Sequence, residues 1–235
     1  MTIAQDLAAT VERLRVEVAA LHGELVRYGL VVWTAGNISA RVPGADLLVI
    51  KPSGVPYDQL TPGNMVVCDL YGNVVEGDHQ PSSDTATSAF VYRSMPGIGG
   101  VVHTHSTYAT AWASRGEAIP CVLTMMADEF GGEIPIAPFA LIGGEQIGKA
   151  IVETLRDHRS NAVLLKNHGV FAIGASAREA VKAAVMCEDV ARSVHIARQL
   201  GSPLPIVPAD IDALYDRYQN EYGQRPATST EQDTP

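Results

Sequence analysis

Two long helical segments enclose a series of short strand-like runs in this chain of 235 residues. In the first segment, apolar residues recur at alternating spacings of four and three from Leu7 to Tyr28, so they form one stripe on a helix that Gly29 ends. The second segment runs from Ser176 to Leu200, with Ser176 as its N-cap and Gly201 as its stop. Helices of this length fit an all-β barrel badly, so we expect them to pack onto a sheet.

The segments between these helices predict a single α/β domain with a central, mostly antiparallel β-sheet flanked by helices. Strands are expected at 30–33, 47–50, 65–68, 74–75, 99–105, 162–166 and 170–173. Further helices are expected at 83–95, 107–114, 144–159 and 209–218. We expect the domain to span residues 1–224 and to be followed by a polar, disordered tail over 225–235.

Composition and charge exclude several classes of protein. Hydrophobic residues make up 46% and charged residues 18% of the chain, which is a globular composition. The net charge of -9 argues against binding to nucleic acid or to a membrane surface. No apolar run approaches the roughly 18 residues of a spanning helix, and no signal peptide is visible. The scattered Cys68, Cys121 and Cys187 predict buried thiols in a reducing compartment, so we expect a cytoplasmic protein.

Three histidines are the strongest candidates for chemistry. His103 and His105 follow an apolar run, and residues two apart on a strand point to the same face. His168 likewise follows the apolar run 162–165. Three imidazoles with an open fourth position are typical of a catalytic metal site, whereas the HxH pair alone is equally compatible with hydrogen-bonded surface histidines. We expect no special role for the remaining histidines, which are His22, His79, His158 and His195.

Two loops suit an anionic ligand. Ser82 and Ser83 precede a predicted helix, whose free N–H groups favour a phosphate. Asp84 fits either the start of that helix or a metal ligand, and the two interpretations are compatible. The loop Lys51-Pro-Ser53-Gly54 combines a cation, a hydroxyl and a glycine that lets backbone approach an anion.

Taken together, six short motifs resemble the class II aldolase/epimerase family, and most closely its L-ribulose-5-phosphate 4-epimerase branch. The resemblance covers about residue 7 to Gln224 and implies the three-layer α/β/α fold of that family. In chain order the motifs are Gly36-Asn37, Lys51-Pro-Ser-Gly54, Pro81-Ser-Ser-Asp84-Thr85, His103-Thr-His105-Ser106, Asn167-His-Gly169 and Tyr222-Gly-Gln224.

The resemblance implies a metal centre and a sugar-phosphate pocket. One Zn²⁺ per subunit would be held by His103, His105, His168 and Asp84, a ligand set that also suits Mn²⁺ or Co²⁺. The substrate and its phosphate would be lined by Gly36, Asn37, Ser53, Gly54, Ser82 and Ser83.

The resemblance also implies that Asp128 and Tyr222 are the catalytic acid and base. In this family they reach the site from a neighbouring subunit of a cyclic homotetramer. Fuculose-phosphate aldolases resemble the chain but carry a glutamate where Asp84 stands, so Asp84 and Asp128 favour the epimerase. Arg217 is the candidate phosphate partner ahead of the last tyrosine, because no histidine follows His195.

The implied activity is epimerisation at C4 of a ketopentose phosphate, from L-ribulose 5-phosphate to D-xylulose 5-phosphate, as in arabinose catabolism. The implied route is retro-aldol cleavage and re-addition through an enediolate, with the metal as Lewis acid. Two alternatives remain open. The first is a sugar-phosphate aldolase that releases free aldehyde, and the second is a protein that binds metal and sugar phosphate without turnover.

Overall fold

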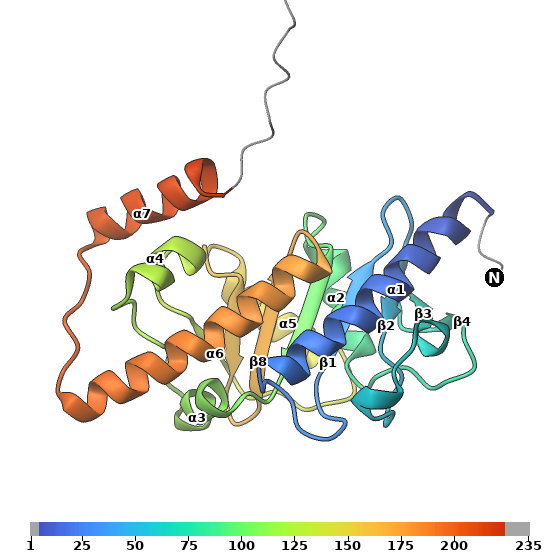
Figure 1. Ribbon diagram of the computed structural model, residues 1–235, viewed down its shortest axis with the longest axis horizontal. Helices are drawn as coiled ribbons and strands as arrows, with labels where there is room; N and C mark the ends of the chain where they lie inside the picture. The colour runs from blue at the N-terminus through green and yellow to red at the C-terminus, as the bar shows by residue number, and fades with distance from the viewer. Residues whose placement is uncertain (1–4, 224–235) are drawn as a thin grey trace, which may run out of the picture.

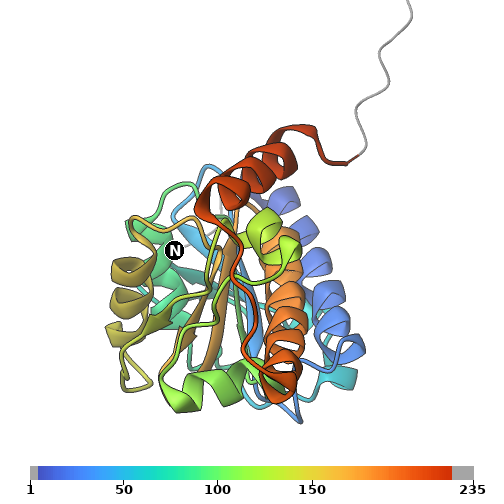
Figure 2. The same ribbon diagram turned by 90° about the vertical axis from the view of Figure 1, so that its left-hand side faces the viewer.

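A computed structural model describes residues 5–223 and shows one eight-stranded sheet between two layers of helices (Figures 1 and 2). The strand order is β4-β3-β2-β1-β5-β8-β7-β6, and neighbours pair antiparallel except for β6 and β7. The predicted fold class is therefore confirmed, whereas the predicted tail over 225–235 lies outside the described residues. The strands are β1 (Asn37–Arg41), β2 (Leu47–Ile50), β3 (Val66–Asp69), β4 (Val74–Glu76), β5 (Gly100–Thr104), β6 (Ile136–Ala137), β7 (Ala162–Leu165) and β8 (Gly169–Gly174). The helices are α1 (Gln5–Arg27), α2 (Thr85–Ser94), α3 (Thr107–Arg115), α4 (Thr124–Phe130), α5 (Gln146–Leu155), α6 (Ala177–Leu200) and α7 (Pro208–Glu221).

Alternation along the strands divides the hydrophobic core between the two faces of the sheet. Val102 packs with α1, α3 and α6, whereas its neighbour Val101 packs with α2 and α5 on the other face. Figure 2 shows these two helical layers on either side of the sheet. Cys187 and Cys68 are buried in the first and second core as predicted, and Cys121 is only partly buried.

The two long helices form as the sequence predicts and lie side by side on one face of the sheet (Figure 1). The Ser176 hydroxyl accepts a hydrogen bond from the N–H of Glu179 at 3.2 Å. The Glu179 carboxylate in turn accepts from the N–H of Ala175 at 3.0 Å. These bonds satisfy backbone donors at the start of α6, and Gly201 ends the helix.

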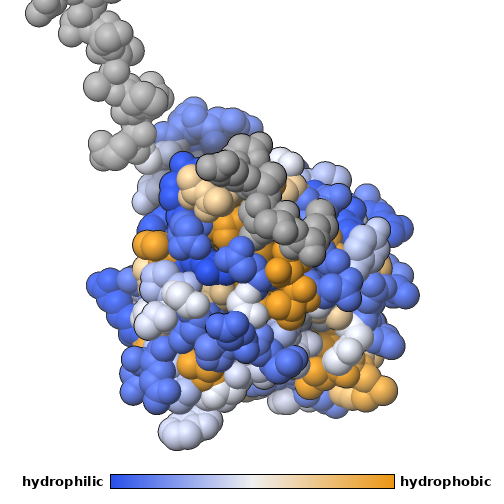
Figure 3. Space-filling view, turned by 90° about the vertical axis from the view of Figure 1, so that its right-hand side faces the viewer, coloured by the Kyte–Doolittle hydropathy of each residue, from blue (hydrophilic) through white to orange (hydrophobic). Residues whose placement is uncertain are grey.

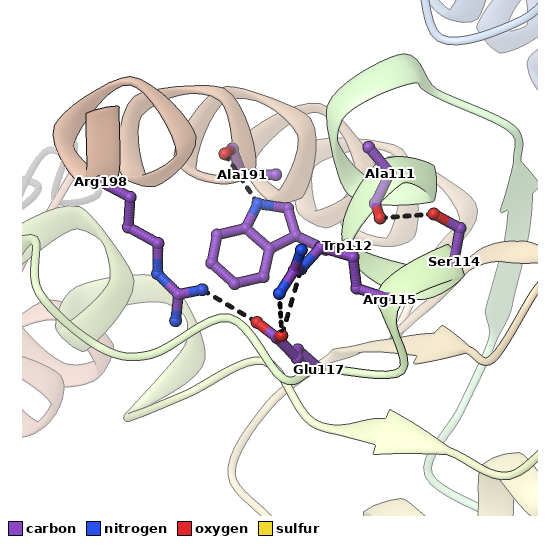
Figure 4. Close-up of polar contacts among 7 residues, drawn as sticks. All are labelled: Ala111, Trp112, Ser114, Arg115, Glu117, Ala191 and Arg198. Atoms are coloured by element: carbon purple, nitrogen blue, oxygen red, sulfur yellow. Dashed lines mark hydrogen bonds and ion pairs between the residues drawn. The ribbon is translucent and has the colours of Figure 1, made fainter.

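Helix α3 begins soon after His105 and is fastened to α6 by the buried Trp112 (Figure 4). The indole Nε1 donates to the carbonyl of Ala191 at 3.1 Å. The Arg198 guanidinium covers the indole ring at 4.2 Å and donates to Glu117 at 2.9 Å. The segment that follows His105 is therefore held by a packed helix pair.

Two secondary-structure expectations were wrong, and some short elements were not predicted. The segment 30–33 forms a turn instead of a strand, because the N–H of Leu30 bonds back to Leu25 at 2.9 Å and Trp33 adopts a φ of +58°. The helix expected at 144–159 is confined to Gln146–Leu155. Strand β1 and helix α4 were not predicted, because one is short and mostly polar and the other has no side-chain cap.

The end of the molecule at the edge strand β4 is mostly hydrophilic, with scattered hydrophobic patches (Figure 3). Val74 of β4 is one of the exposed hydrophobic residues. Among the helices of the described chain, none is both long and apolar enough to cross a bilayer.

Candidate metal centre and substrate pocket

The candidate site lies where β5 ends and its two antiparallel neighbours, β1 and β8, begin. Asn37 begins β1 and is paired in register with His103 of β5, which in turn is paired with Phe171 of β8. The His103 ring stacks on Phe171 with 4.2 Å between centroids and 14° between planes. Because β5 is buried along its whole length, the strand delivers His103 to the floor of the site.

The turn between β7 and β8 presents His168 to the same place. Asn167 adopts a φ of +59°, which asparagine tolerates, and its N–H donates to the carbonyl of Ala113 at 3.0 Å. A Cβ on Gly169 would lie 2.5 Å from the Thr104 carbonyl oxygen and 2.8 Å from His105 Cδ2. Only glycine therefore allows this turn to approach the end of β5 so closely.

The three histidines converge as predicted, with one ring nitrogen from each lying within 4.8 Å of the other two. His103 Nδ1 donates to the carbonyl of Val170 at 2.8 Å, which leaves Nε2 unprotonated and facing His105 Nε2 at 3.0 Å. His168 Nδ1 is buried and has no hydrogen-bond partner in the described chain. His103 is buried, His168 half-buried and His105 exposed, so the cluster has an open side. These features fit a divalent metal with a free coordination position.

The electrostatics of the cluster favour neutral imidazoles. Burial, together with the neighbouring histidines, lowers the pKa of His103 to about 4, and Asp84 opposes this effect. Burial also lowers the pKa values of His105 and His168. A histidine binds a metal ion through its neutral imidazole. The lowered pKa values therefore favour cation binding near neutral pH.

The histidines form part of a pocket of about 300 Å³. Asp84 lies in this pocket with an exposed fraction of 6%, and its Oδ2 accepts from Asn37 Nδ2 at 2.7 Å. Asp84 lies outside the 4.8 Å histidine group, so its role as a ligand stays a prediction. All the predicted substrate residues line the same pocket, namely Gly36, Asn37, Ser53, Gly54, Ser82 and Ser83.

The two predicted anion loops pair with each other at the mouth of the pocket. The N–H of Ser53 donates to the carbonyl of Gln80 at 2.8 Å, and the N–H of Ser82 donates to that of Lys51 at 3.0 Å. Ser53 and Ser83 are exposed, and helix α2 begins directly after Asp84. The mouth therefore offers hydroxyls and a helix N-terminus, whereas the floor offers imidazoles and a carboxylate.

Lys51 is a site residue whose burial the sequence did not reveal. Its exposed fraction is 2%, its Nζ donates to the carbonyls of Pro52 (3.2 Å) and Thr34 (3.4 Å), and it lies 5.3 Å from the centroid of the Tyr57 ring. No carboxylate lies within ion-pair distance of it among the described residues. Burial lowers its pKa. An ammonium group without a counter-ion therefore lines the pocket, which attracts an anionic ligand.

His22 contradicts our expectation that it has no special role. Its Nδ1 donates to the carbonyl of Val18 at 2.7 Å, and its Nε2 accepts from the N–H of Ile38 at 3.0 Å. Burial lowers its pKa to about 3. The imidazole thus joins α1 to β1 beside the pocket. The histidines at 79, 158 and 195 do not line this pocket.

Asp128 and Tyr222 do not line the pocket of their own chain. Asp128 lies on α4, where its Oδ1 is 3.5 Å from Nη2 of Arg217. Tyr222 follows α7 and is 67% exposed. Ile142, an exposed side chain from the loop before α5, lines the pocket and was not predicted. The proposed roles of Asp128, Tyr222 and Arg217 remain predictions.

The fold and the pocket define an α/β domain with a three-histidine cluster suited to a divalent metal. The family model described as the class II aldolase and adducin N-terminal domain matches residues 16–195. The chain therefore belongs to this family.

Several solved structures are similar to this chain. An L-fuculose 1-phosphate aldolase is 26% identical with a TM-score of 0.83, and the match covers 93% of this chain and 98% of that one. YgbL from Klebsiella pneumoniae is 28% identical with a TM-score of 0.75, over 87% of this chain and 99% of that one. The L-fuculose-1-phosphate aldolase from Thermus thermophilus is 26% identical with a TM-score of 0.69, over 83% and 99%.

Proposed function

We propose that this chain is an enzyme that cleaves and re-forms a carbon–carbon bond in a ketose phosphate, and that it acts as an L-ribulose-5-phosphate 4-epimerase. The observation that carries the proposal is the shared pocket, which is lined by the histidine cluster, by Asp84 and by the two loops predicted to bind an anion. A phosphate at the mouth would direct the sugar carbons toward the cluster. The motif residues Asp84 and Asp128 favour epimerase over aldolase.

The metal that we propose is Zn²⁺, held by His103, His105 and His168 with Asp84 as the carboxylate ligand. When bound, it would supply Lewis-acid stabilisation for negative charge on the C2 and C3 oxygens of the substrate. The His103 ring is oriented for this task by its bond to the Val170 carbonyl.

The side chains of the protein account for binding and proton transfer. Lys51 and the hydroxyls of Ser53 and Ser83 would hold the phosphate. A base removes the proton of the C4 hydroxyl, the C3–C4 bond breaks, and its electrons form a C2–C3 enediolate beside glycolaldehyde phosphate. The aldehyde turns, the enediolate adds to its opposite face, and an acid returns a proton to the C4 oxygen. We assign these two proton transfers to Asp128 and Tyr222.

Because neither Asp128 nor Tyr222 lines the pocket of its own chain, the proposal requires a second copy to supply them. We therefore propose a homotetramer with the site at a subunit interface. The second candidate function is aldol cleavage with release of the aldehyde, which the two similar L-fuculose 1-phosphate aldolases favour.

Product analysis separates the candidates. Zinc-loaded protein is incubated with L-ribulose 5-phosphate, and D-xylulose 5-phosphate, dihydroxyacetone and glycolaldehyde phosphate are followed together, with a chelated control. L-fuculose 1-phosphate is tested in parallel. We expect chelator-sensitive formation of D-xylulose 5-phosphate without free aldehyde. Free aldehyde from either substrate would replace the epimerase with an aldolase, and no turnover of either would refute both.

A further inference from the structure

Helix α7 docks onto the rest of the molecule through α4 (Figures 1 and 2). No α7 residue is fully buried, so this contact is not part of the main hydrophobic core. The half-buried residues of α7 recur at helical spacing and form one face, made of Ile211, Leu214, Tyr215 and Tyr218. A helix held this way depends on specific contacts for its position.

Glu129 on α4 is a buried carboxylate at this contact. Its side chain is 1% exposed, and its Oε2 lies 2.9 Å from Lys182 Nζ on α6. Its Oε1 accepts from Asn161 Nδ2 at 3.0 Å. Burying a charge costs free energy unless it is paired and hydrogen-bonded, so the placement of this carboxylate is strongly constrained.

Tyr218 of α7 completes the cluster. Lys182 Nζ lies 5.4 Å from the centroid of its ring, and the Tyr218 hydroxyl lies in the electrostatic field of Glu129 and Lys182. Burial and the charge of Glu129 raise the pKa of Tyr218. The ion pair between the buried Glu129 of α4 and the half-exposed Lys182 of α6 therefore also contacts a side chain of α7.

Each proposed acid or base side chain touches a residue of the other helix or of the cluster. Asp128 of α4 contacts Arg217 of α7 at 3.5 Å between Oδ1 and Nη2. The Tyr222 ring stacks on Tyr218, with 4.6 Å between centroids and 24° between planes. The Glu129 cluster is thus linked by direct contact or by chain neighbours to both Asp128 and Tyr222.

Gly131, which ends α4 with a φ of +61°, allows α7 to sit directly on the backbone. A Cβ at this position would lie 2.7 Å from Arg159 Cδ and 2.9 Å from Tyr215 Cδ2. Any side chain here would push Tyr215, and with it α7, away from α4. The position of α7 therefore depends on close packing at Gly131 as well as on the charged Glu129 cluster.

We infer that Glu129 and Tyr218 are positioning residues, which hold α4 and α7 together as one arm that presents Asp128 and Tyr222 at a fixed separation. The inference rests on the proposed function, because the position of the arm affects catalysis only if Asp128 and Tyr222 transfer protons. Glu129 and Tyr218 themselves touch no substrate. They act through the residues next to them.

The test compares Glu129→Gln and Tyr218→Phe with the matched control Asp212→Asn. The control breaks another ion pair of α7, between Arg159 and Asp212 at 2.5 Å, but leaves the Glu129 cluster intact. Tyr218→Phe removes one hydroxyl and keeps the ring, so it tests the cluster even if Glu129→Gln fails to fold. Hydrogen exchange across residues 208–221, metal content, kcat and KM are measured for the full-length protein.

For Glu129→Gln we expect faster hydrogen exchange in α7 and a fall in kcat of about 100-fold. A small displacement of catalytic groups lowers the rate by about this factor. KM and metal content should stay near those of the wild type, because the histidines, Asp84 and the residues proposed to hold the phosphate lie outside the arm. A smaller fall is expected for Tyr218→Phe, and neither change for Asp212→Asn. Unchanged exchange would refute the docking role, and faster exchange with unchanged kcat would refute the positioning role. Absence of turnover in the wild type would refute the proposed function and the positioning role, while the exchange comparison would still decide docking.

Discussion

Replacement of His22 by glutamine tests how one buried imidazole makes the fold sensitive to acid. The pKa of His22 in the folded chain is about 3, against 6.5 for the free side chain, because the ring is buried. Below pH 6.5 the unfolded chain therefore takes up a proton that the folded chain does not. The free energy of unfolding is therefore not reduced by His22 above pH 6.5. It falls as the pH decreases from 6.5 toward 3.

The size of this effect follows from the two pKa values. Each pH unit inside the window corresponds to about 1.4 kcal/mol. At about pH 5 the wild type should have lost about 2 kcal/mol through His22 alone. His22→Gln has no such titration, although it will be less stable at neutral pH by about 1–3 kcal/mol if the Ile38 N–H loses its acceptor.

Urea unfolding followed by circular dichroism measures this difference. The free energy of unfolding is determined at about pH 7.5 and about pH 5 for chelated protein, which removes any contribution from bound metal. The wild type should lose about 2 kcal/mol more than His22→Gln between these pH values. His79→Gln, which removes an exposed histidine, should behave like the wild type. An equal loss in the wild type and His22→Gln would refute the reasoning.

Four further substitutions test the site. His103→Ala should abolish metal binding measured by elemental analysis, and full occupancy would contradict its role as a ligand. Lys51→Met should raise the KM for a phosphorylated substrate about tenfold or more, since a charge-assisted contact is lost; an unchanged KM would show that the ammonium does not contact the phosphate. Gly169→Ala should destabilise the fold by about 1–3 kcal/mol in thermal denaturation, because its Cβ would overlap the Thr104 carbonyl; an unaltered melting temperature would count against the close approach. Tyr222→Phe should slow epimerisation by about 100-fold or more with metal retained, and normal turnover would remove Tyr222 from the mechanism.

The histidine cluster was predictable because it depends on local rules. The period of two along a strand places His103 and His105 together, and the end of a buried apolar run places His168 at the end of its strand. The spacing of the residues alone does not show which strands are neighbours in the sheet. The structure shows that β5 and β8 are neighbours, so the two strand ends meet.

Other features were missed because tertiary contacts decide them. The apolar segment 30–33 has strand-like composition, but the hydrogen bond from the N–H of Leu30 to the carbonyl of Leu25 caps the C-terminus of α1 and turns the chain. The burial of Lys51 and His22 depends on packing between distant segments. The polarity of the two side chains alone would place them at the surface.

Asp128 and Tyr222 illustrate a different limit. The family resemblance selects them as acid and base, yet in one chain they lie outside the pocket. Their proposed role depends on how copies of the chain assemble, which local sequence patterns do not determine. The contacts of α4 with α7 show only how one chain holds them on a common arm.

Turnover measured against added metal shows whether the histidine cluster is a catalytic metal centre. Chelated wild-type protein is titrated with Zn²⁺, and the conversion of L-ribulose 5-phosphate is followed beside bound metal, with His103→Ala in parallel. We expect activity to rise with bound metal, to reach its maximum at one ion per chain and to stay absent in His103→Ala. Turnover that is independent of metal, or equal in His103→Ala, would contradict this expectation.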